Sequence, residues 1–348
     1  MNIIPDIIYN VVLLFIMMLP GVILKKCGLS ANGVGKGISN LVLYIAQPAL
    51  IFLAYLREFS WTLLINSCYV LALSIVAHAI FSIIALSVYR REPDSARRML
   101  RFATVFSNAA FMGIPLISAI FESTFPEATV YASIYNITFN FFLWSLGVYI
   151  CTDDRDEDGD GVTDGDVLTD YHEVRKKKKS TASPIKALYH PVTLAALLGL
   201  VFFIFPIHGV VDSFAGGIIR DSLEMLRALV APLSMTVIGL RLADMNFNGV
   251  LKDKAMYIFL ALRHLVLPLS VVLLIKLLDI CGLHIDSVVT TVVVIMAAAP
   301  AASSATMFAE KYDCDAAYVS RLVTISTLLS VATMPLILKI LEVVLPVA

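Results

Sequence analysis

Long apolar stretches separated by short polar segments run along most of the chain. Ten of them are long enough to cross a hydrocarbon core of about 30 Å, which takes about 20 helical residues. Unpaired backbone groups are costly in lipid, and these stretches are too long for barrel strands. The pattern therefore predicts an all-α polytopic membrane protein. Its predicted spans are 6–24, 38–56, 61–89, 101–121, 128–151, 187–206, 228–246, 255–279, 287–310 and 317–345. Residues 214–227 are predicted to form a short amphipathic helix at an interface, ahead of the seventh span.

Composition supports this assignment and excludes several classes of protein. The 348 residues are 59% hydrophobic and 15% charged, whereas soluble domains average about 45–50% and 25%. A soluble enzyme, a disordered chain and a nucleic-acid binder are therefore excluded. The charges are also uneven, because residues 153–186 hold 17 of the 53 charged side chains. One short polar segment thus interrupts a chain that otherwise lies in the membrane.

The Lys and Arg residues predict the orientation. Of those in loops or near span ends, 19 fall on the side of the 152–186 loop and 5 on the other. Cytoplasmic loops carry the excess of basic residues. The 152–186 loop is therefore predicted to be cytoplasmic. Ten spans then place both termini outside a multi-pass protein of the plasma membrane.

The chain divides into two halves of five spans, 1–151 and 187–348, joined by the 152–186 loop. An odd number of spans makes the two halves insert with opposite topology. IAQPALIF in the second span resembles LVAPLSMT in the seventh, and SNAAFMGIPLI in the fourth resembles MAAAPAASSA in the ninth. An inverted repeat with matched interrupted helices is typical of secondary transporters.

Proline and glycine interrupt the fourth and ninth spans. Gly113 and Pro115 are predicted to break span four, with Pro115 opening a second half-helix. Pro300 is predicted to break span nine, which places Ser303 and Ser304 in a new first turn. The two half-helix N-termini are expected to meet near the midplane, each with free N–H groups and about half a positive charge.

Neutral hydrogen-bonding side chains lie beside both breaks, namely Ser107, Asn108, Ser303, Ser304 and Thr306. The pattern predicts a site for an anion, most simply a carboxylate. The alternative is that the prolines and small residues only permit kinks and close packing. All 27 acidic residues fall in loops or near span ends, which argues against a sodium/proton antiporter.

Each of the other polar residues inside the spans has two possible roles. Gln47, Asn136 and Asn140 either line a cavity or hydrogen bond between helices. His78 either relays protons or packs as a neutral histidine, and packing is favoured. Arg263, next to His264, either counters a substrate carboxylate or snorkels to the cytoplasmic surface, and snorkelling is favoured.

The joining loop contains a run of alternating carboxylates. Asp156, Asp158, Asp160 and Asp164, with Gly161, fit a pattern that wraps Ca²⁺ in oxygen ligands, and Asp154 starts an overlapping register. The alternative is a solvated acidic linker. No other cofactor is expected, because no cysteine pair has CxxC spacing. No metal or nucleophile cluster appears either, so we expect no enzymatic activity.

Several motifs in this order resemble the auxin efflux carrier family: SNLVLYIAQPALIF, FSNAAFMGIPLISAIFE, LVAPLSMTVIGLRLAD, LRHLVLPL and IMAAAPAASSATMFAEKYDCD. The family includes plant PIN auxin carriers and prokaryotic permeases for malate, malonate and similar acids. The resemblance implies ten helices in a 5+5 inverted repeat, two crossed, broken helices, a homodimer and elevator-type movement. It matches Asn108 and the Pro115 break to the first crossover, and Pro300, Ala301, Ser303 and Ser304 to the second.

Together these features predict a carrier for small organic acid anions, bound by Gln47, Ser107, Asn108, Gly113, Pro115, Asn136, Asn140, Pro300, Ser303 and Ser304. One alternative is a sodium-coupled symporter of the bile-acid type, which shares the architecture. The other is a calcium-regulated receptor or channel without transport. The acidic loop departs from the family pattern, and it is too short to be the long insert of plant PIN proteins.

Overall fold

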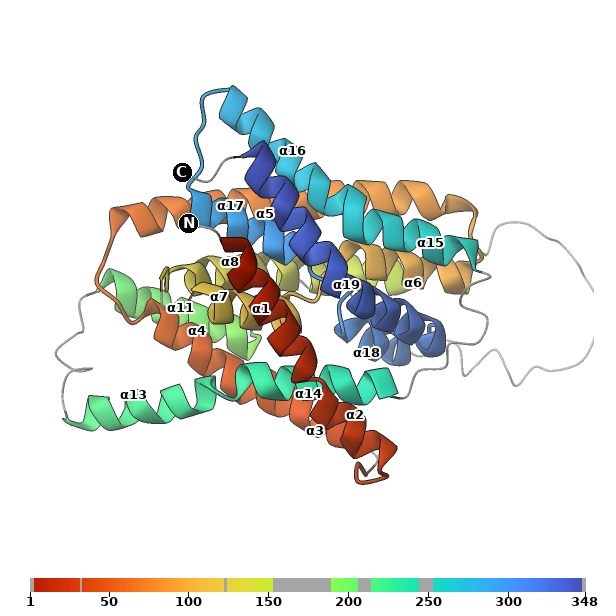
Figure 1. The fold of residues 1–348 in the computed structure, drawn as a ribbon, viewed down its shortest axis with the longest axis horizontal. Coiled ribbons are helices and arrows are strands. Elements are labelled where there is room, and N and C mark those ends of the chain that lie inside the picture. Colours follow the sequence, from red (N-terminus) through yellow and green to blue (C-terminus); the bar gives the residue numbers. More distant parts are fainter. Residues whose placement is uncertain are drawn as a thin grey trace, which may run out of the picture.

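The computed structural model describes residues 3–31, 33–121, 124–152, 189–205, 214–243 and 253–345, and its regular structure in these ranges is helical (Figure 1). In the first half the helices are α1 (Ile3–Ile16), α2 (Leu19–Lys26), α3 (Val34–Leu41), η1 (Val42–Ala46), α4 (Gln47–Tyr55), α5 (Trp61–Val88), η2 (Tyr89–Arg91), α6 (Asp94–Val105), η3 (Ala109–Gly113), α7 (Ile114–Phe121), α8 (Ala128–Phe142), η4 (Leu143–Gly147) and α9 (Val148–Thr152). In the second half they are α11 (Pro191–Ile204), α13 (Phe214–Arg227), α14 (Val230–Ala243), α15 (Lys254–Ala261), η6 (Leu262–Val266), α16 (Leu267–Ile280), α17 (Ser287–Ala298), α18 (Ser304–Lys311) and α19 (Ala316–Val344). The prediction of an all-α protein is confirmed for these residues.

Seven helical stretches in the described ranges are long and apolar enough to cross a membrane: Ile8–Lys26, Val34–Tyr55, Trp61–Arg91, Ala128–Thr152, Gly216–Ala243, Lys254–Ile280 and Ala316–Val344. They overlap seven of the ten predicted spans. The other three contain the shorter apolar helices Ala109–Phe121, Pro191–Ile204 and Ser287–Ala298. The predicted helix at 214–227 forms as α13, at the start of the Gly216–Ala243 stretch. The count of ten spans and the interfacial position of α13 stay predictions.

Three intrahelical prolines follow a wide π-helical turn. A proline removes one backbone N–H and its ring clashes with the carbonyl one turn earlier. Adding one residue to the preceding turn relieves that clash. In each case the residue before the proline donates to the carbonyl five residues back: Gln47 to Val42, Ile114 to Ala109, and Leu267 to Leu262. The helices therefore continue through Pro48, Pro115 and Pro268.

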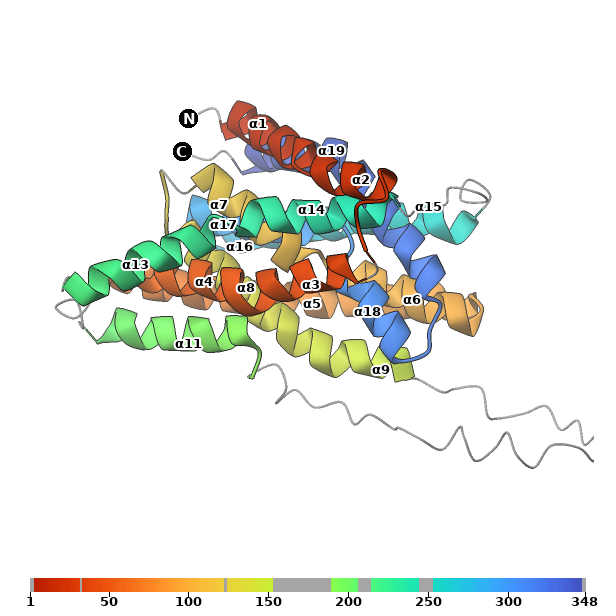
Figure 2. The ribbon, with the colours of Figure 1, turned by 90° about the horizontal axis from the view of Figure 1, so that it is seen from below.

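The helices pack in two groups, and each group takes helices from both halves of the chain. In the first, α4 packs against α11 and α13, and α14 packs against α2 and α3. In the second, α8 packs against α5, α7 and α17, and α19 packs against α17 and α18. Figures 1 and 2 show α4, α11 and α13 running side by side at one edge of the molecule. The two halves of the sequence are thus interleaved in space.

The first and last helices lie next to each other. In both views α1 runs beside α19, with the start of α1 and the end of α19 at the same end of the molecule (Figures 1 and 2). An even number of crossings between them would produce this arrangement.

Two glycines bring α2 and α14 into close contact. An ideal Cβ on Gly239 would lie 2.0 Å from the carbonyl oxygen of Met18, and one on Gly21 would lie 2.1 Å from that of Thr236. Small residues at helix contacts let backbones approach this closely in membrane proteins. The first group therefore depends on backbone-to-backbone packing at this crossing.

Candidate functional site

In the described residues, each half of the chain contains a helix that is broken by a short extended segment. In the first half α6 ends at Val105, residues 106–108 are non-helical, and η3 begins at Ala109. The prediction that the break lies at Gly113 and Pro115 is therefore wrong. The π-helical turn of η3 accommodates Pro115, and the helix begins upstream of both residues.

The second interruption matches the prediction. Helix α17 ends at Ala298, and Pro300 lies in the non-helical stretch. Ser303 occupies the N-cap position of α18, which begins at Ser304, without a side-chain capping bond. At the start of a helix, the first four backbone N–H groups have no partner within the helix. Each break is thus followed by a new helix start, at Ala109 and at Ser304.

The two interruptions are hydrogen bonded to each other. Ser107 and Ala301 form an isolated antiparallel bridge. The N–H of Asn108 donates to the Pro300 carbonyl at 2.6 Å, and the N–H of Ala302 donates to the Phe106 carbonyl at 2.8 Å. The Oδ1 atom of Asn108 accepts the N–H of Ser303 at 3.5 Å. The two helix starts are therefore held at one place.

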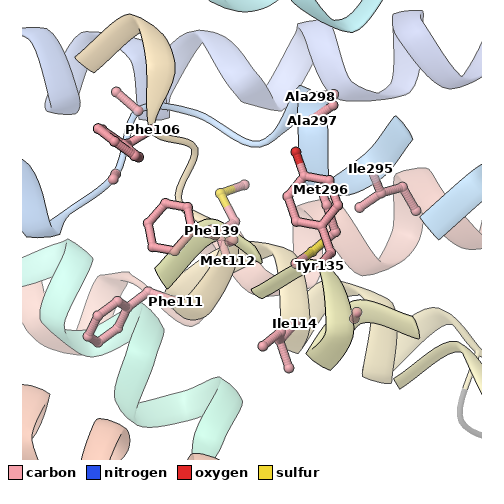
Figure 3. Packing of buried hydrophobic residues seen from close by; sticks show 14 of the residues in the cluster. Phe106, Phe111, Met112, Ile114, Tyr135, Phe139, Ile295, Met296, Ala297 and Ala298 are labelled. Carbon is pink, nitrogen blue, oxygen red and sulfur yellow. The ribbon is translucent and has the colours of Figure 1, made fainter. Parts of the chain in front are cut away.

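Buried apolar side chains surround this junction (Figure 3). The Phe106 ring packs edge-on against Phe139 of α8 with centroids 5.7 Å apart. Met296 of α17 lies so close to Gly113 that a Cβ there would be 2.6 Å from its sulfur. Gly113 therefore has a packing role and does not reach the cavity described next.

A cavity of about 60 Å³ opens beside the junction. A cavity needs about 10–15 Å³ to hold one water, so this cavity has room for several waters or for one carboxylate-sized group. The lining residues are Leu43, Gln47, Ser107, Asn108, Ala110, Phe111, Asn136, Phe139, Asn140, Leu143, Trp144, His190, Ala302, Ser304 and Met307. The structure thus brings together six predicted residues, namely Gln47, Ser107, Asn108, Asn136, Asn140 and Ser304.

Several polar atoms at this cavity have no hydrogen-bond partner within the described part of the chain. The nitrogen atoms are Asn108 Nδ2, Asn140 Nδ2, Trp144 Nε1 and His190 Nδ1, and the oxygen atoms are Gln47 Oε1, Asn136 Oδ1 and Ser304 Oγ. A buried polar group left unpaired costs about 1–3 kcal/mol. Their clustering on one cavity makes it a candidate site for a polar ligand.

The cavity is neutral apart from its helix ends. No Asp, Glu, Lys or Arg side chain is among its lining residues. The positive dipole ends of two helix starts and the two unpaired side-chain amide nitrogens favour negative charge. The arrangement therefore suits a carboxylate better than a cation.

Four of the predicted binding residues lie elsewhere. Gly113 packs on Met296, and Pro115 lines a separate cavity of about 240 Å³ together with Arg227. Pro300 and Ser303 are in the second break and contact Asn108 through their backbone. The Thr306 side chain is not among the lining residues either. These residues shape the junction from outside the cavity.

Two lining residues with polar atoms were not predicted. Trp144 lies four residues after Asn140, which itself lies four residues after Asn136, so one helical face carries all three. That spacing could have identified Trp144. His190 precedes α11 and reaches the cavity only through the tertiary fold.

Arg263 does not snorkel, and that prediction is wrong. Its side chain is fully buried in η6. Its guanidinium donates to the carbonyls of Thr104 at 3.0 Å, Ala299 at 3.1 Å and Ala297. These carbonyls lie at the C-terminal ends of α6 and α17. The Arg263 charge is therefore stabilised by helix ends inside the protein and not at the cytoplasmic surface.

The two buried histidines are hydrogen bonded. His78 Nδ1 is 2.8 Å from the Ser74 carbonyl, and its ring packs among aromatic residues including Tyr135 and Phe142. His264 lies between the hydroxyls of Ser326 and Thr333, each at 2.9 Å. Neither histidine lines the cavity.

The predicted calcium ligands Asp154, Asp156, Asp158, Asp160 and Asp164 lie outside the described residues. Within the described ranges, no group of three or more His, Cys, Asp or Glu residues could hold a metal ion. Calcium binding by the loop stays a prediction.

His190 adds a titratable group to the lining of the cavity. Protonation of a histidine beside the cavity adds a positive charge next to the proposed anion. For an anion whose own charge is constant, we therefore expect affinity to rise as the pH falls and His190 gains a proton. His190→Gln should remove the rise, as measured by titration calorimetry. A rise that persists in this variant would contradict the assignment.

Comparison with known proteins identifies the family. A family model described as a membrane transport protein matches residues 6–338. No curated protein matches the chain. The match covers nearly the whole sequence, including both interrupted helices and every residue that lines the cavity. The chain therefore belongs to the membrane transport protein family, which is the auxin efflux carrier family.

Proposed function

We propose that the protein is a secondary carrier that moves small organic acid anions across the plasma membrane. The observation that carries this proposal is the cavity at the two helix starts, with unpaired amide and indole N–H groups and no carboxylate. An anion there would accept hydrogen bonds from Asn108, Asn140 and Trp144. Such bonds to a charged group are worth about 1.5–3 kcal/mol each.

The proposed movement is alternating access of the elevator type. The cavity lies between the two packed groups, because Gln47 belongs to α4 of the first group, and Asn140 and Ser304 belong to α8 and α18 of the second. Hydrogen bonds from Gln47 Nε2 to the Ala110 carbonyl, from Arg241 to the Ser303 carbonyl, and between the Tyr55 and Ser133 hydroxyls link the two groups. Sliding of the second group along the first would carry the site across the membrane. The ten-span inverted repeat, the crossing of the broken helices and a homodimer belong to the same proposal.

The described state is proposed to be inward-facing. His190 follows the 152–186 loop, and Met307 lies one turn before Lys311 in α18. Both the loop and Lys311 lie on the side that the basic residues predict to be cytoplasmic. The cavity therefore leads toward that side, and the termini are proposed to lie outside.

Counterflow into proteoliposomes tests the function. Vesicles preloaded with an unlabelled dicarboxylate or monocarboxylate are given the same anion in labelled form outside. A carrier accumulates label transiently above equilibrium, and we expect this without added sodium or calcium. Strict sodium dependence would favour a bile-acid-type symporter. Conductance without counterflow would favour a channel, and absence of both with every acid would contradict transport of organic anions.

A further inference from the structure

Arg263 lies beside the second group of helices, because η6 packs against α19. It is the largest fully buried side chain in the described residues and lies in the π-helical turn η6. Three of its N–H groups bond to backbone carbonyls of Thr104, Ala297 and Ala299. The guanidinium also lies over the Phe81 ring, 5.6 Å from its centroid. No acidic side chain pairs with it among the described residues.

The three carbonyls belong to the same ends of two helices. Thr104 is the second-last residue of α6, Ala297 is the second-last of α17, and Ala299 follows the end of α17. The last carbonyls of a helix lack intrahelical partners and carry about half a negative charge. One guanidinium therefore joins and neutralises the C-terminal ends of both interrupted helices.

The helix starts on the other side of the two breaks keep their partial positive charge. The helix starts at Ala109 and Ser304 have no acidic residue beside the cavity. A buried cation whose partners are only dipoles is costly unless further negative charge comes near. A bound carboxylate at the two helix starts supplies that charge, on the other side of the bridge between Ser107 and Ala301.

We propose that Arg263 is the positioning residue of the anion site. It fixes the C-terminal ends of both interrupted helices, so that the two N-terminal ends stay together as the positive part of the cavity. The inference rests on the proposed function for the identity of the ligand, but the fixing of the junction does not depend on transport.

His264 provides a matched control beside Arg263. Its Nε2 atom is 2.9 Å from Ser326 Oγ, which accepts the N–H of Ala301 at 2.9 Å. His264 is therefore linked to the second break through the Ser326 hydroxyl. Its replacement by Asn changes a side chain beside the junction but leaves the Arg263 charge and its three carbonyl contacts in place.

The first experiment measures the KM for counterflow, which is a separate quantity from the maximal rate. In counterflow, Arg263→Met is expected to raise the KM for a monocarboxylate at least 10-fold, and Arg263→Lys to recover most of that loss because the charge is kept. His264→Asn should change KM less than 3-fold. Equal KM values in wild type and Arg263→Met would overturn the proposal, as would a Lys variant no better than the Met variant.

The second readout needs no transport. Hydrogen exchange of the Asn108 and Ala302 amides reports the two bonds that join the breaks. We expect exchange at both to accelerate at least 10-fold in Arg263→Met, with α11 unchanged as an internal reference. Unchanged exchange at both amides would overturn the positioning role. If wild-type protein transports no acid but these amides respond, the proposed function fails and the positioning of the junction stands. If Arg263→Met does not fold, the same comparison is made with Arg263→Lys, where we expect a smaller acceleration.

Discussion

Asn108→Ala is expected to reduce counterflow of an organic anion about 100-fold while the protein stays folded. The side chain contributes on two sides, since Oδ1 accepts the Ser303 N–H and Nδ2 faces the cavity unpaired. The loss of one hydrogen bond to a charged ligand costs about 1.5–3 kcal/mol, or about 10- to 150-fold in affinity. Loosening of the second break adds to this. The rate is measured in proteoliposomes with protein amounts matched.

Two further variants make the Asn108 result specific. Asn108→Asp keeps the shape and the acceptor for Ser303 but removes the donor and adds a negative charge, so it should transport no better than the Ala variant. Asn66→Ala removes another buried asparagine, whose Nδ2 bonds to the Tyr131 hydroxyl away from the cavity. That control should keep transport within about 3-fold. Normal transport by Asn108→Ala would show that the site is elsewhere.

Much of the fold was predictable because each span has its own hydropathy signal. Apolar length alone located the seven long stretches, and composition alone separated them from the acidic loop. The position of Ser303 and Ser304 at a helix start also followed from local sequence, because Pro300 interrupts an Ala-rich apolar span and both serines come shortly after it. These features depend on residues close together in the chain.

The errors arose where distant backbone decides the outcome. Pro115 does not break its helix because η3 widens by one residue, and hydropathy does not register a wider turn. The actual break at 106–108 is stabilised by carbonyls and N–H groups of residues near 300. Arg263 is buried because Thr104, more than 150 positions away, and Ala297 supply its partners. No local pattern around Arg263 reveals those carbonyls.

The residues that line the cavity were predictable where they repeat at helical spacing or are polar inside an apolar span. Asn136 and Asn140 lie on one face of α8, and that face is buried at the junction. Gln47 was identified by its polarity inside an apolar span. His190 was missed because it is a single polar residue at the start of α11, and only tertiary packing brings it to the cavity. Polarity inside an apolar span thus identifies cavity-lining residues well within spans and poorly at their ends.

The second large effect is expected from Gly239→Ala, at the crossing of α2 and α14. The new Cβ would meet the Met18 carbonyl oxygen at 2.0 Å and its carbon at 3.0 Å, with the Gly21 Cα at 3.2 Å. These are backbone atoms, which do not move aside by changing rotamer, so the two helices must separate. Overpacking costs about 1–3 kcal/mol and at times more, and backbone contact places this site at the upper end. We expect the apparent unfolding temperature in detergent to fall markedly, or the protein not to accumulate.

Gly217→Ala is the matched control for this prediction, because it makes the same chemical change in helix α13. A Cβ there would meet nothing within 4 Å, and alanine favours a helix over glycine by about 1 kcal/mol. Its unfolding temperature should equal or exceed that of wild type. Gly21→Ala should resemble Gly239→Ala, since its Cβ would lie 2.1 Å from the Thr236 oxygen on the same crossing. If Gly239→Ala and Gly217→Ala unfold at the same temperature, α2 and α14 are not in backbone contact, and the first group of helices is less rigid than the proposed sliding mechanism requires.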